Sequence, residues 1–254
     1  MQHLSFGLED QVVIVTGGAG AIGVAICAGF AEAGARVAVV DLDEATAQAI
    51  ADALPGRHIG LGCDLRNVAT MGDLIARVEQ GLGPADHLVN IAGVIKRTDD
   101  LFAVTEADWD LQHDVNIKAL FFVSQAFARR LVEDGRDGSI VNYTSQGWMS
   151  GGFGGSVVYN AAKGAVTTLT RGMARSWAPH GIRVNAVAPG LVETPMLVTP
   201  DTTEEDLDAL RASIPLKRLG QPEDHVGTTV FLTSRMAHYM TGATVNVSGG
   251  FLMY

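Results

Sequence analysis

The chain has little cysteine and no long apolar run. Its two cysteines, Cys27 in a helical pattern and Cys63 after a strand-like run, are too few for a disulfide framework or a zinc site, so we expect reduced core thiols. No segment approaches the roughly 18–20 consecutive apolar residues that span a bilayer. The opening MQHLSFGLEDQ also lacks a basic segment followed by an apolar one. These absences predict a cytoplasmic protein with neither a membrane nor a metal as partner.

Positive charge is scarce as well. The chain carries 18 Lys and Arg against 28 Asp and Glu, a formal net charge of −10. Adjacent basic residues occur only at 96–97, 129–130 and 217–218, whereas binding to a nucleic-acid backbone depends on clustered Lys and Arg. We therefore exclude nucleic acid as a partner. The abundant residues are apolar ones, at 47%, and glycine, at 30 residues against 8 prolines, which is typical of a compact protein with many tight turns.

Short β-branched runs alternate with segments of helical period along the whole chain. Strands are predicted at 12–16, 36–41, 58–64, 87–92, 139–145, 183–189 and 244–250. Helices are predicted at 21–34, 43–54, 67–82, within 105–134, at 156–179 and at 222–235. Apolar strands separated by helices predict a parallel sheet that is covered on both faces. We expect one doubly wound, Rossmann-type α/β domain over residues 1–254, with seven parallel strands.

A glycine-rich turn, TGGAGAIG at 16–23, follows the first predicted strand and begins the first predicted helix. Gly18, Gly20 and Gly23 satisfy the pattern GxGxxG. Such glycines let the backbone approach a pyrophosphate, whose charge is stabilised by the amino end of the helix. The alternative is an ordinary turn between a strand and a helix.

Asp41 ends the second predicted strand, 18 residues after Gly23. An acid near this spacing accepts hydrogen bonds from an adenosine ribose. It could instead cap the next helix, because DLDEA precedes that helix. An acid would repel a 2′-phosphate, and neither 18–20 nor 42 supplies a Lys or Arg to bind one. The sequence therefore favours NAD over NADP.

Several motifs, taken in order, resemble the short-chain dehydrogenase/reductase family in its form of about 250 residues. They are the glycine turn, CDL at 63–65, NIAG at 90–93, YNAAK at 159–163, RVNAVAPG followed by LVETPM, and TGATVNVSGG at 241–250. The resemblance runs from about residue 8 to 250. This sequence departs from the family pattern at Ala21, at Ile91 and at Ser248.

The resemblance implies a set of cofactor contacts. It assigns the adenine amino group to Asp64 and the nicotinamide carboxamide to Thr194. The implied contacts to NAD are Gly17, Gly20, Ala21, Ile22, Gly23, Asp41, Leu42, Asp64, Leu65, Asn90, Ala92, Gly93, Tyr159, Lys163, Pro189, Gly190, Val192 and Thr194.

The resemblance also implies four catalytic residues: Asn116, Ser145, Tyr159 and Lys163. Tyr159 and Lys163 are four apart, so they share one face of a helix. We expect the ammonium group and bound NAD⁺ to lower the pKa of Tyr159, which then takes the proton of a substrate hydroxyl. Ser145 would bind the same oxygen, and Asn116 would hold a water for proton transfer. Asn116 could instead satisfy local backbone groups, and Ser145 could be a turn serine beside Thr144.

The substrate is only weakly indicated. Gln146, Trp148 and Phe153 in the loop after Ser145 are candidate contacts, with 194–213 as a lid and the Pro- and Asp-rich stretch 195–206 as its most mobile part. Lys96 and Arg97 could bind a carboxylate or could simply be solvated. Because IAGVIKR is similar to sugar-acid dehydrogenases of the family, we expect a sugar acid or polyol. A hydroxysteroid, a 3-oxoacyl thioester or a small cyclic alcohol comes next.

Two functions of another class stay open. One is a non-catalytic NAD-binding regulator, and the other is a structural subunit whose dinucleotide site stabilises the fold. Both Tyr159 and Lys163 are present, which favours an enzyme. The resemblance further implies a homotetramer paired through the long helices and the last strand, and the apolar segment GGFLMY at 249–254 suits such an interface.

Overall fold

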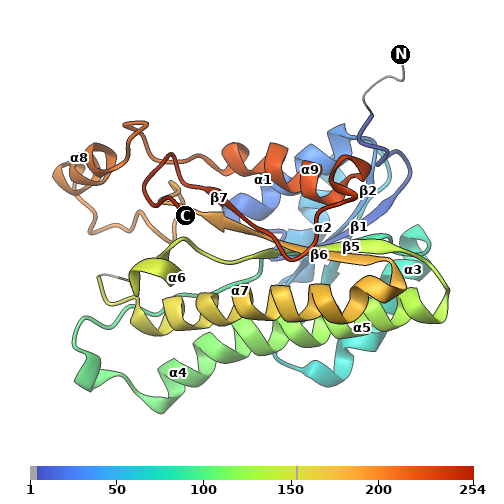
Figure 1. Cartoon of the computed structure of the whole chain (residues 1–254), viewed down its shortest axis with the longest axis horizontal. Helices are drawn as coiled ribbons and strands as arrows, with labels where there is room; N and C mark the ends of the chain where they lie inside the picture. Colours follow the sequence, from blue (N-terminus) through green and yellow to red (C-terminus); the bar gives the residue numbers. More distant parts are fainter. Residues whose placement is uncertain (1–4, 153) are drawn as a thin grey trace.

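The computed structural model describes residues 5–152 and 154–254, and in this part of the chain seven strands form one parallel sheet (Figure 1). The strand order is β3-β2-β1-β4-β5-β6-β7. The strands are β1 Val12–Thr16, β2 Arg36–Asp41, β3 Ile59–Gly62, β4 His87–Asn90, β5 Gly138–Tyr143, β6 Ile182–Pro189 and β7 Thr244–Val247. The central strands are almost wholly buried because helices cover both faces, so the predicted doubly wound fold is confirmed.

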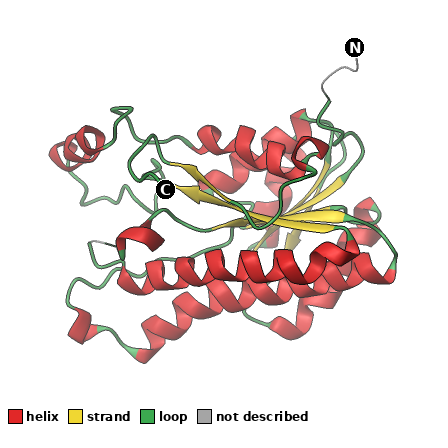
Figure 2. Ribbon diagram, viewed as in Figure 1, coloured by secondary structure: helices red, strands yellow, loops and turns green. Residues whose placement is uncertain are grey.

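Helices pack on both faces of this sheet (Figure 2). One apolar cluster joins the sheet to α3, α5 and α7, and the second joins it to α1, α2 and α9. The helices of the described chain are α1 Ala21–Glu32, α2 Glu44–Ala53, α3 Met71–Leu82, α4 Glu106–His113, α5 Leu120–Glu133, α6 Gly147–Ser150, α7 Val157–Trp177, α8 Glu204–Ser213 and α9 Val226–Thr233.

The strand order reverses beside β1. This strand pairs with β2 on one side and with β4 on the other, and Thr16 at its carboxyl end lies opposite Val40 and Asn90. The connections after β1 and β4 therefore leave the sheet in opposite directions, which opens a crevice at the carboxyl ends of the strands. The fold places the glycine turn and the segment after NIAG on the two sides of this crevice.

The structure differs from the sequence prediction mainly near the lid. Residues 204–213 form α8, inside the stretch 194–213 that we predicted as a lid and for which we listed no helix. A capping box between Thr203 and Asp206 starts this helix, and its acidic first turn suits the positive end of the helix dipole. The cap of α2 is Asp43, whose side chain accepts the amide of Thr46 at 2.7 Å. Asp41 is therefore not the helix cap.

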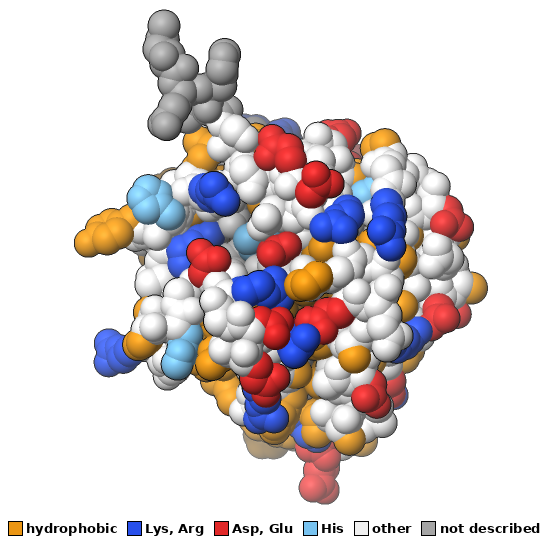
Figure 3. All heavy atoms as spheres, turned by 90° about the vertical axis from the view of Figure 1, so that its right-hand side faces the viewer, with side chains coloured by type: hydrophobic (Ala, Val, Ile, Leu, Met, Phe, Trp, Pro, Cys, Tyr) orange, Lys and Arg blue, Asp and Glu red, His pale blue; other side chains and the backbone are white. Residues whose placement is uncertain are grey.

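The surface away from the crevice carries mixed charges. Figure 3 shows the side that lies on the right in Figure 1, where basic and acidic side chains are intermixed. Over residues 5–152 and 154–254, no helix is both long enough and apolar enough to cross a bilayer.

Candidate active site

The glycine turn is folded so tightly that two of its glycines have no room for a side chain. Gly17 has a φ of +67°, and a Cβ there would lie 2.6 Å from the amide nitrogen of Ala92. A Cβ on Gly23 would overlap the carbonyl oxygen of Gly17. The turn thus brings α1 against the segment after β4, and the backbone faces the crevice without side chains in between.

The amino end of α1 is free to bind an anion. Its N-cap residue is Gly20, which offers no side-chain hydrogen bond, so the first amides of α1 have no acceptor from a cap. Ala21, Ile22 and Gly23 in this first turn line the cavity described below. Uncapped amides at the positive end of a helix fit a pyrophosphate.

Asp41 lies beside this turn with both oxygens held. Its Oδ2 accepts the amide of Ala19 at 2.9 Å, and its Oδ1 accepts the amide of Leu42 at 2.7 Å. Two amide donors fix the carboxylate at the mouth of the glycine turn. A carboxylate held in this way is placed to accept hydrogen bonds from a ribose hydroxyl.

The adjoining end of the cavity contains a cation that the sequence prediction missed. Arg66 pairs with Asp64, with 2.7 Å between Nη2 and Oδ2, and it lines the cavity. The hydrogen bonds from Arg66 hold the pKa of Asp64 below its usual value. Cys63 lies next to this pair, and burial raises the pKa of its thiol. Arg66 and Asp64 are only two residues apart in the sequence, so the motif CDLR at 63–66 could have indicated this ion pair.

Tyr159 and Ser145 meet at the opposite end. Burial raises the pKa of Tyr159 to about 12, while the charge of Arg97 and a hydrogen bond with Ser145 lower it in part. The hydroxyl of Ser145 also accepts the amide of Gly147 at 3.1 Å. The neighbouring Thr144 instead donates to the carbonyl of Lys163 at 2.6 Å, so its hydroxyl is occupied inside the protein. Ser145, rather than Thr144, is the hydroxyl that accompanies Tyr159.

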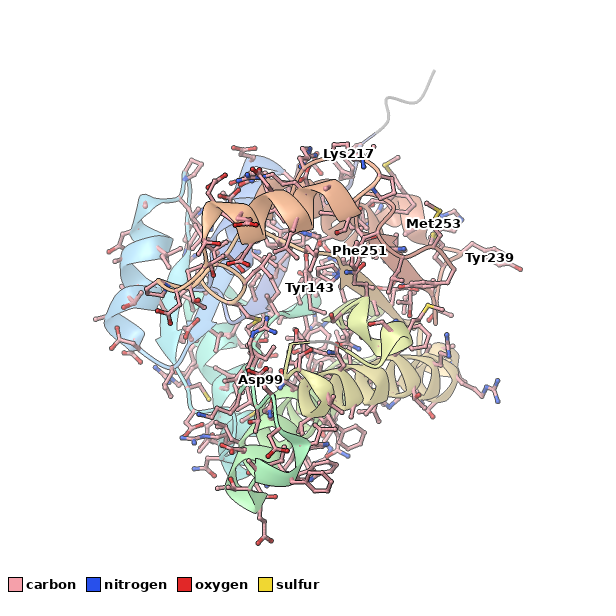
Figure 4. All side chains as sticks on the ribbon, turned by 90° about the vertical axis from the view of Figure 1, so that its left-hand side faces the viewer. Asp99, Tyr143, Lys217, Tyr239, Phe251 and Met253 are labelled. Carbon is pink, nitrogen blue, oxygen red and sulfur yellow. The ribbon has the colours of Figure 1, made fainter. Side chains whose placement is uncertain are left out.

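Lys163 lies on the same face of α7 as Tyr159, as the spacing predicts. Its Nζ is 5.6 Å from the centre of the Tyr159 ring and donates to the carbonyl of Tyr143 at 2.9 Å. Burial lowers the pKa of Lys163 to about 8. We expected Lys163 to lower the pKa of Tyr159; the charge of Arg97 does lower it, but burial outweighs this effect and the pKa lies above its ordinary value. Figure 4 shows Tyr143 near the centre of this end of the molecule, between α8 and α7.

Two loops close the Tyr159 end. The amide of Thr98 donates to the carbonyl of Gly155 at 3.0 Å, and the Arg97 Nη1 donates to the carbonyl of Gly154 at the same distance. Within the described residues Arg97 forms no ion pair. The segment after β4 and the segment before α7 are thus joined, with an uncompensated cation between them.

All these groups face one cavity of about 830 Å³. The predicted site residues that line it are Gly17, Gly20, Ala21, Ile22, Gly23, Asp41, Leu42, Asp64, Leu65, Ala92, Gly93, Ser145, Gln146, Tyr159, Lys163, Pro189, Gly190, Val192 and Thr194. Met196 and Leu197 of the predicted lid line it as well, while α8 packs on Leu191 and Phe251 in a small apolar cluster.

Three predicted site residues lie off the cavity wall, and a fourth, Phe153, is outside the described residues. Asn90 is buried in the sheet, where its amide donates to Ser124 and Asn142, both at 2.9 Å. The ring of Trp148 packs against Tyr254, with 5.6 Å between ring centres. These two side chains support the site from outside, because the sheet and α6 turn them away from the cavity.

Asn116 is the third of these residues. It lies in a π-helical turn, Asp114–Ala119, between α4 and α5. Its side chain bonds both backbone groups of Val94, at 3.1 and 2.8 Å, and donates to the carbonyl of Gln112 at 2.8 Å. This matches the alternative that Asn116 satisfies local backbone groups, and it fixes the segment after NIAG. A role in holding a water stays a prediction.

The fold and the cavity define a dinucleotide-binding α/β domain with a Tyr–Lys pair at one end of its crevice. Residues 17–252 match the family described as enoyl-(acyl carrier protein) reductase. The chain belongs to the short-chain dehydrogenase/reductase family, whose members of this kind are oxidoreductases acting on CH–OH groups.

Similar proteins extend over the full length. Galactitol 2-dehydrogenase of Rhizobium johnstonii is 40% identical and covers 97% of this chain and 96% of its own. The 2-dehydro-3-deoxy-D-gluconate 5-dehydrogenase of Escherichia coli is 37% identical over 98% of both chains. A short-chain type dehydrogenase/reductase from Mycobacterium marinum has a similar crystal structure, with a TM-score of 0.89, 32% identity and 98% of both chains covered.

Proposed function

We propose that this protein is an NAD(H)-dependent oxidoreductase that interconverts a secondary alcohol and a ketone, with Tyr159 as its acid and base. The observation that carries the proposal is the placing of Tyr159, Ser145 and Lys163 at one end of a cavity whose other end is the glycine turn. Hydroxyl and ammonium groups at that place suit proton transfer to or from a substrate oxygen.

The chain's own residues would divide the proton chemistry between them. Tyr159 keeps its proton at neutral pH while its pKa is about 12, and that form donates to a carbonyl oxygen in the reducing direction. Ser145 would stabilise the negative charge that develops on the same oxygen. Lys163, held by the carbonyl of Tyr143, would grip a ribose hydroxyl. A bound nicotinamide would supply the hydride and, when oxidised, a positive charge that favours the phenolate of Tyr159.

NAD is the cofactor that we infer. The carboxylate of Asp41, held by two amides, would accept hydrogen bonds from the adenosine ribose and repel a 2′-phosphate. Arg66 does not reverse this preference, because its charge is paired with Asp64. The uncapped amino end of α1 would bind the pyrophosphate.

A sugar acid or polyol is the substrate class that we infer. Arg97 lines the cavity without an ion-pair partner in the described chain and lies within electrostatic reach of Tyr159. A carboxylate of the substrate would pair with such a cation. The names of the similar proteins, a galactitol and a sugar-acid dehydrogenase, favour the same class. A 3-oxoacyl or hydroxysteroid substrate is the alternative, and the description of the matching family favours the acyl compound.

The test combines a substrate panel with one variant. Polyols, sugar acids, hydroxysteroids and simple secondary alcohols are offered with NAD⁺ and with NADP⁺, and NADH absorbance is followed. We expect turnover with NAD⁺, and Tyr159→Phe should reduce it by about 10²–10⁴-fold while NADH binding persists. Turnover retained within about tenfold would exclude Tyr159 as the base. Nucleotide binding without turnover of any compound would favour a regulator or a structural subunit.

We also infer a homotetramer. Tyr239 and Met253 are 96% and 75% exposed, and Figure 4 shows Tyr239 projecting from the molecule. Exposed apolar side chains near the end of the sheet suit contacts between copies. Light scattering on the purified protein gives the mass directly, and a monomeric mass would contradict this inference. The cytoplasmic location stays a prediction.

A further inference from the structure

Gln146 is a buried side chain that lacks partners. It follows Ser145 in the chain, lines the cavity and is only 4% exposed. Its Oε1 is shielded from solvent and accepts no hydrogen bond. Within residues 5–152 and 154–254, its Nε2 also makes no hydrogen bond to the protein, but unlike Oε1 this atom is not shielded from solvent.

A second buried glutamine shows how unusual this is. Gln112 is 1% exposed, and its Oε1 accepts the amide of Lys96 at 3.1 Å while its Nε2 donates to the carbonyl of Asp108 at 3.2 Å. In the described chain, every other buried carboxamide also donates at least one hydrogen bond within the protein: Asn90, Asn116, Asn142, Asn160 and Asn185. The buried carboxamide that makes no hydrogen bond within the described protein is the one in the cavity.

The missing partners cost stability. Burying an amide without hydrogen bonds is unfavourable, and leucine would fill a similar volume without that cost. The backbone of Gln146 is held in place, so it cannot easily move the carboxamide to a new partner. Its amide donates to the carbonyl of Pro189 at 3.0 Å, and Gln146 is the N-cap of α6. A polar group held in this way is suited to a partner that comes from outside the protein.

We propose that the carboxamide of Gln146 binds a second oxygen of the substrate, a hydroxyl group other than the one at which Tyr159 acts. A carboxamide can accept from one hydroxyl and donate to another, so the site would select polyhydroxylated compounds over simple secondary alcohols. Arg97 would bind an acidic group, whereas Gln146 is neutral and suits an uncharged hydroxyl. This inference rests on the proposed function, since it assigns a substrate contact in the same cavity.

The experiment compares Gln146→Leu with the wild type on two matched probes, butane-2,3-diol and butan-2-ol, with NAD⁺. Both compounds carry a secondary alcohol, and only the diol has a second hydroxyl. We expect Gln146→Leu to reduce kcat/KM for the diol by about tenfold or more and to leave that for butan-2-ol within about threefold. Wild-type enzyme that does not prefer the diol, or an equal loss on both probes, would overturn the proposal.

Thermal unfolding supplies a readout that a structural role would not produce. Gln146→Leu should raise the unfolding temperature by about 2–4 °C, because it removes an unsatisfied buried amide. The control Gln112→Leu should lower it, since two hydrogen bonds are lost. If Gln146→Leu lowers the temperature as Gln112→Leu does, Gln146 has a structural role and the proposal fails. Absence of NAD⁺-linked turnover in the wild type across the whole panel is a different result, which rejects the proposed function itself.

Discussion

The two ends of the cavity are built in opposite ways. At the glycine-turn end, close backbone contacts and paired charges fix the geometry: Gly17 packs on Ala92, Asp41 holds two amides, and Arg66 pairs with Asp64. At the Tyr159 end, the carboxamide of Gln146 has no hydrogen bond and Arg97 has no ion pair in the described chain. The glycine-turn end leaves backbone amides at the start of α1 for a ligand, whereas the Tyr159 end leaves polar side chains for a substrate.

The electrostatic environment separates the two ends as well. Burial moves the pKa of Tyr159 up to about 12 and that of Lys163 down to about 8, so burial shifts both groups toward their neutral forms where the chemistry would occur. At the other end, the pKa of Asp64 is lowered by its hydrogen bonds with Arg66 and the carboxylate stays charged. Unsatisfied and perturbed groups gather where the substrate would bind, which is typical of a functional site.

The substitution with the largest expected effect disrupts the close packing at the glycine-turn end. In Gly23→Ala the new Cβ would collide with the Gly17 carbonyl and lie 2.8 Å from the Cα of Gly18, so the turn must shift. We expect about 100-fold lower kcat/KM, because displaced contacts orient the cofactor poorly, and about 1–3 kcal/mol lower stability. Steady-state kinetics and chemical unfolding measure the two effects. The control is Gly72→Ala in the first turn of α3, where a Cβ meets no atom within 4 Å.

Gly72→Ala should unfold at the same denaturant concentration as the wild type or slightly above it, because alanine favours helix. Equal losses in Gly23→Ala and Gly72→Ala would mean that the close packing at the glycine turn does not set its function.

The next effect sharpens the contrast at the Tyr159 end. Arg97→Met removes the unpaired cation, so kcat/KM for a sugar acid should fall by about 10–100-fold, the range for charge-assisted hydrogen bonds. For a neutral alcohol, the pH profile should shift to higher pH, because the charge of Arg97 lowers the pKa of Tyr159. Steady-state rates across pH test both points. Lys96→Met is the matched control, since Lys96 is exposed and does not line the cavity; similar losses in both variants would point to a general charge effect.

The smallest effect concerns the scaffold that both ends share. Burial lowers the pKa of His225 to about 4 and that of His87 to about 3, both below the ordinary 6.5. The unfolded chain therefore binds protons first, and stability falls as pH drops below about 6.5, by up to about 1.4 kcal/mol per pH unit for each histidine. Urea unfolding between pH 7.5 and 5 measures this slope. His225→Leu should lose less stability on acidification, and an unchanged slope would contradict the assignment.

The fold was largely predictable because its signals are local. Five buried β-branched or apolar residues in Val12–Thr16 and the glycines that follow predict a strand, a turn and a helix with little tertiary context. The helix α8 was missed because its many acidic residues mask the period, although the cap at Thr203 was visible. The predicted spans of β3, β4, β5 and β7 were too long at their carboxyl ends, where the chain leaves the sheet, whereas β1, β2 and β6 end where predicted.

The site was predictable only in part. The spacing of Tyr159 and Lys163 indicates a shared helix face, and the structure places them together. That Lys163 is held by Tyr143, and that Arg97 acts on Tyr159, depends on segments far apart in the chain. Likewise the sequence names Gln146 as a candidate contact but cannot indicate that its amide lacks partners, because that follows from how the loops pack.

The joined loops at the Tyr159 end have a practical consequence for redesign. Arg97 and Thr98 are hydrogen-bonded to Gly154 and Gly155, so each loop has the shape that the other allows. A chimera that takes residues 94–100 from a relative but keeps 151–155 of this chain would lose the hydrogen bonds that join the two loops. Changing the preference of this enzyme by transplantation therefore calls for moving both segments as one unit.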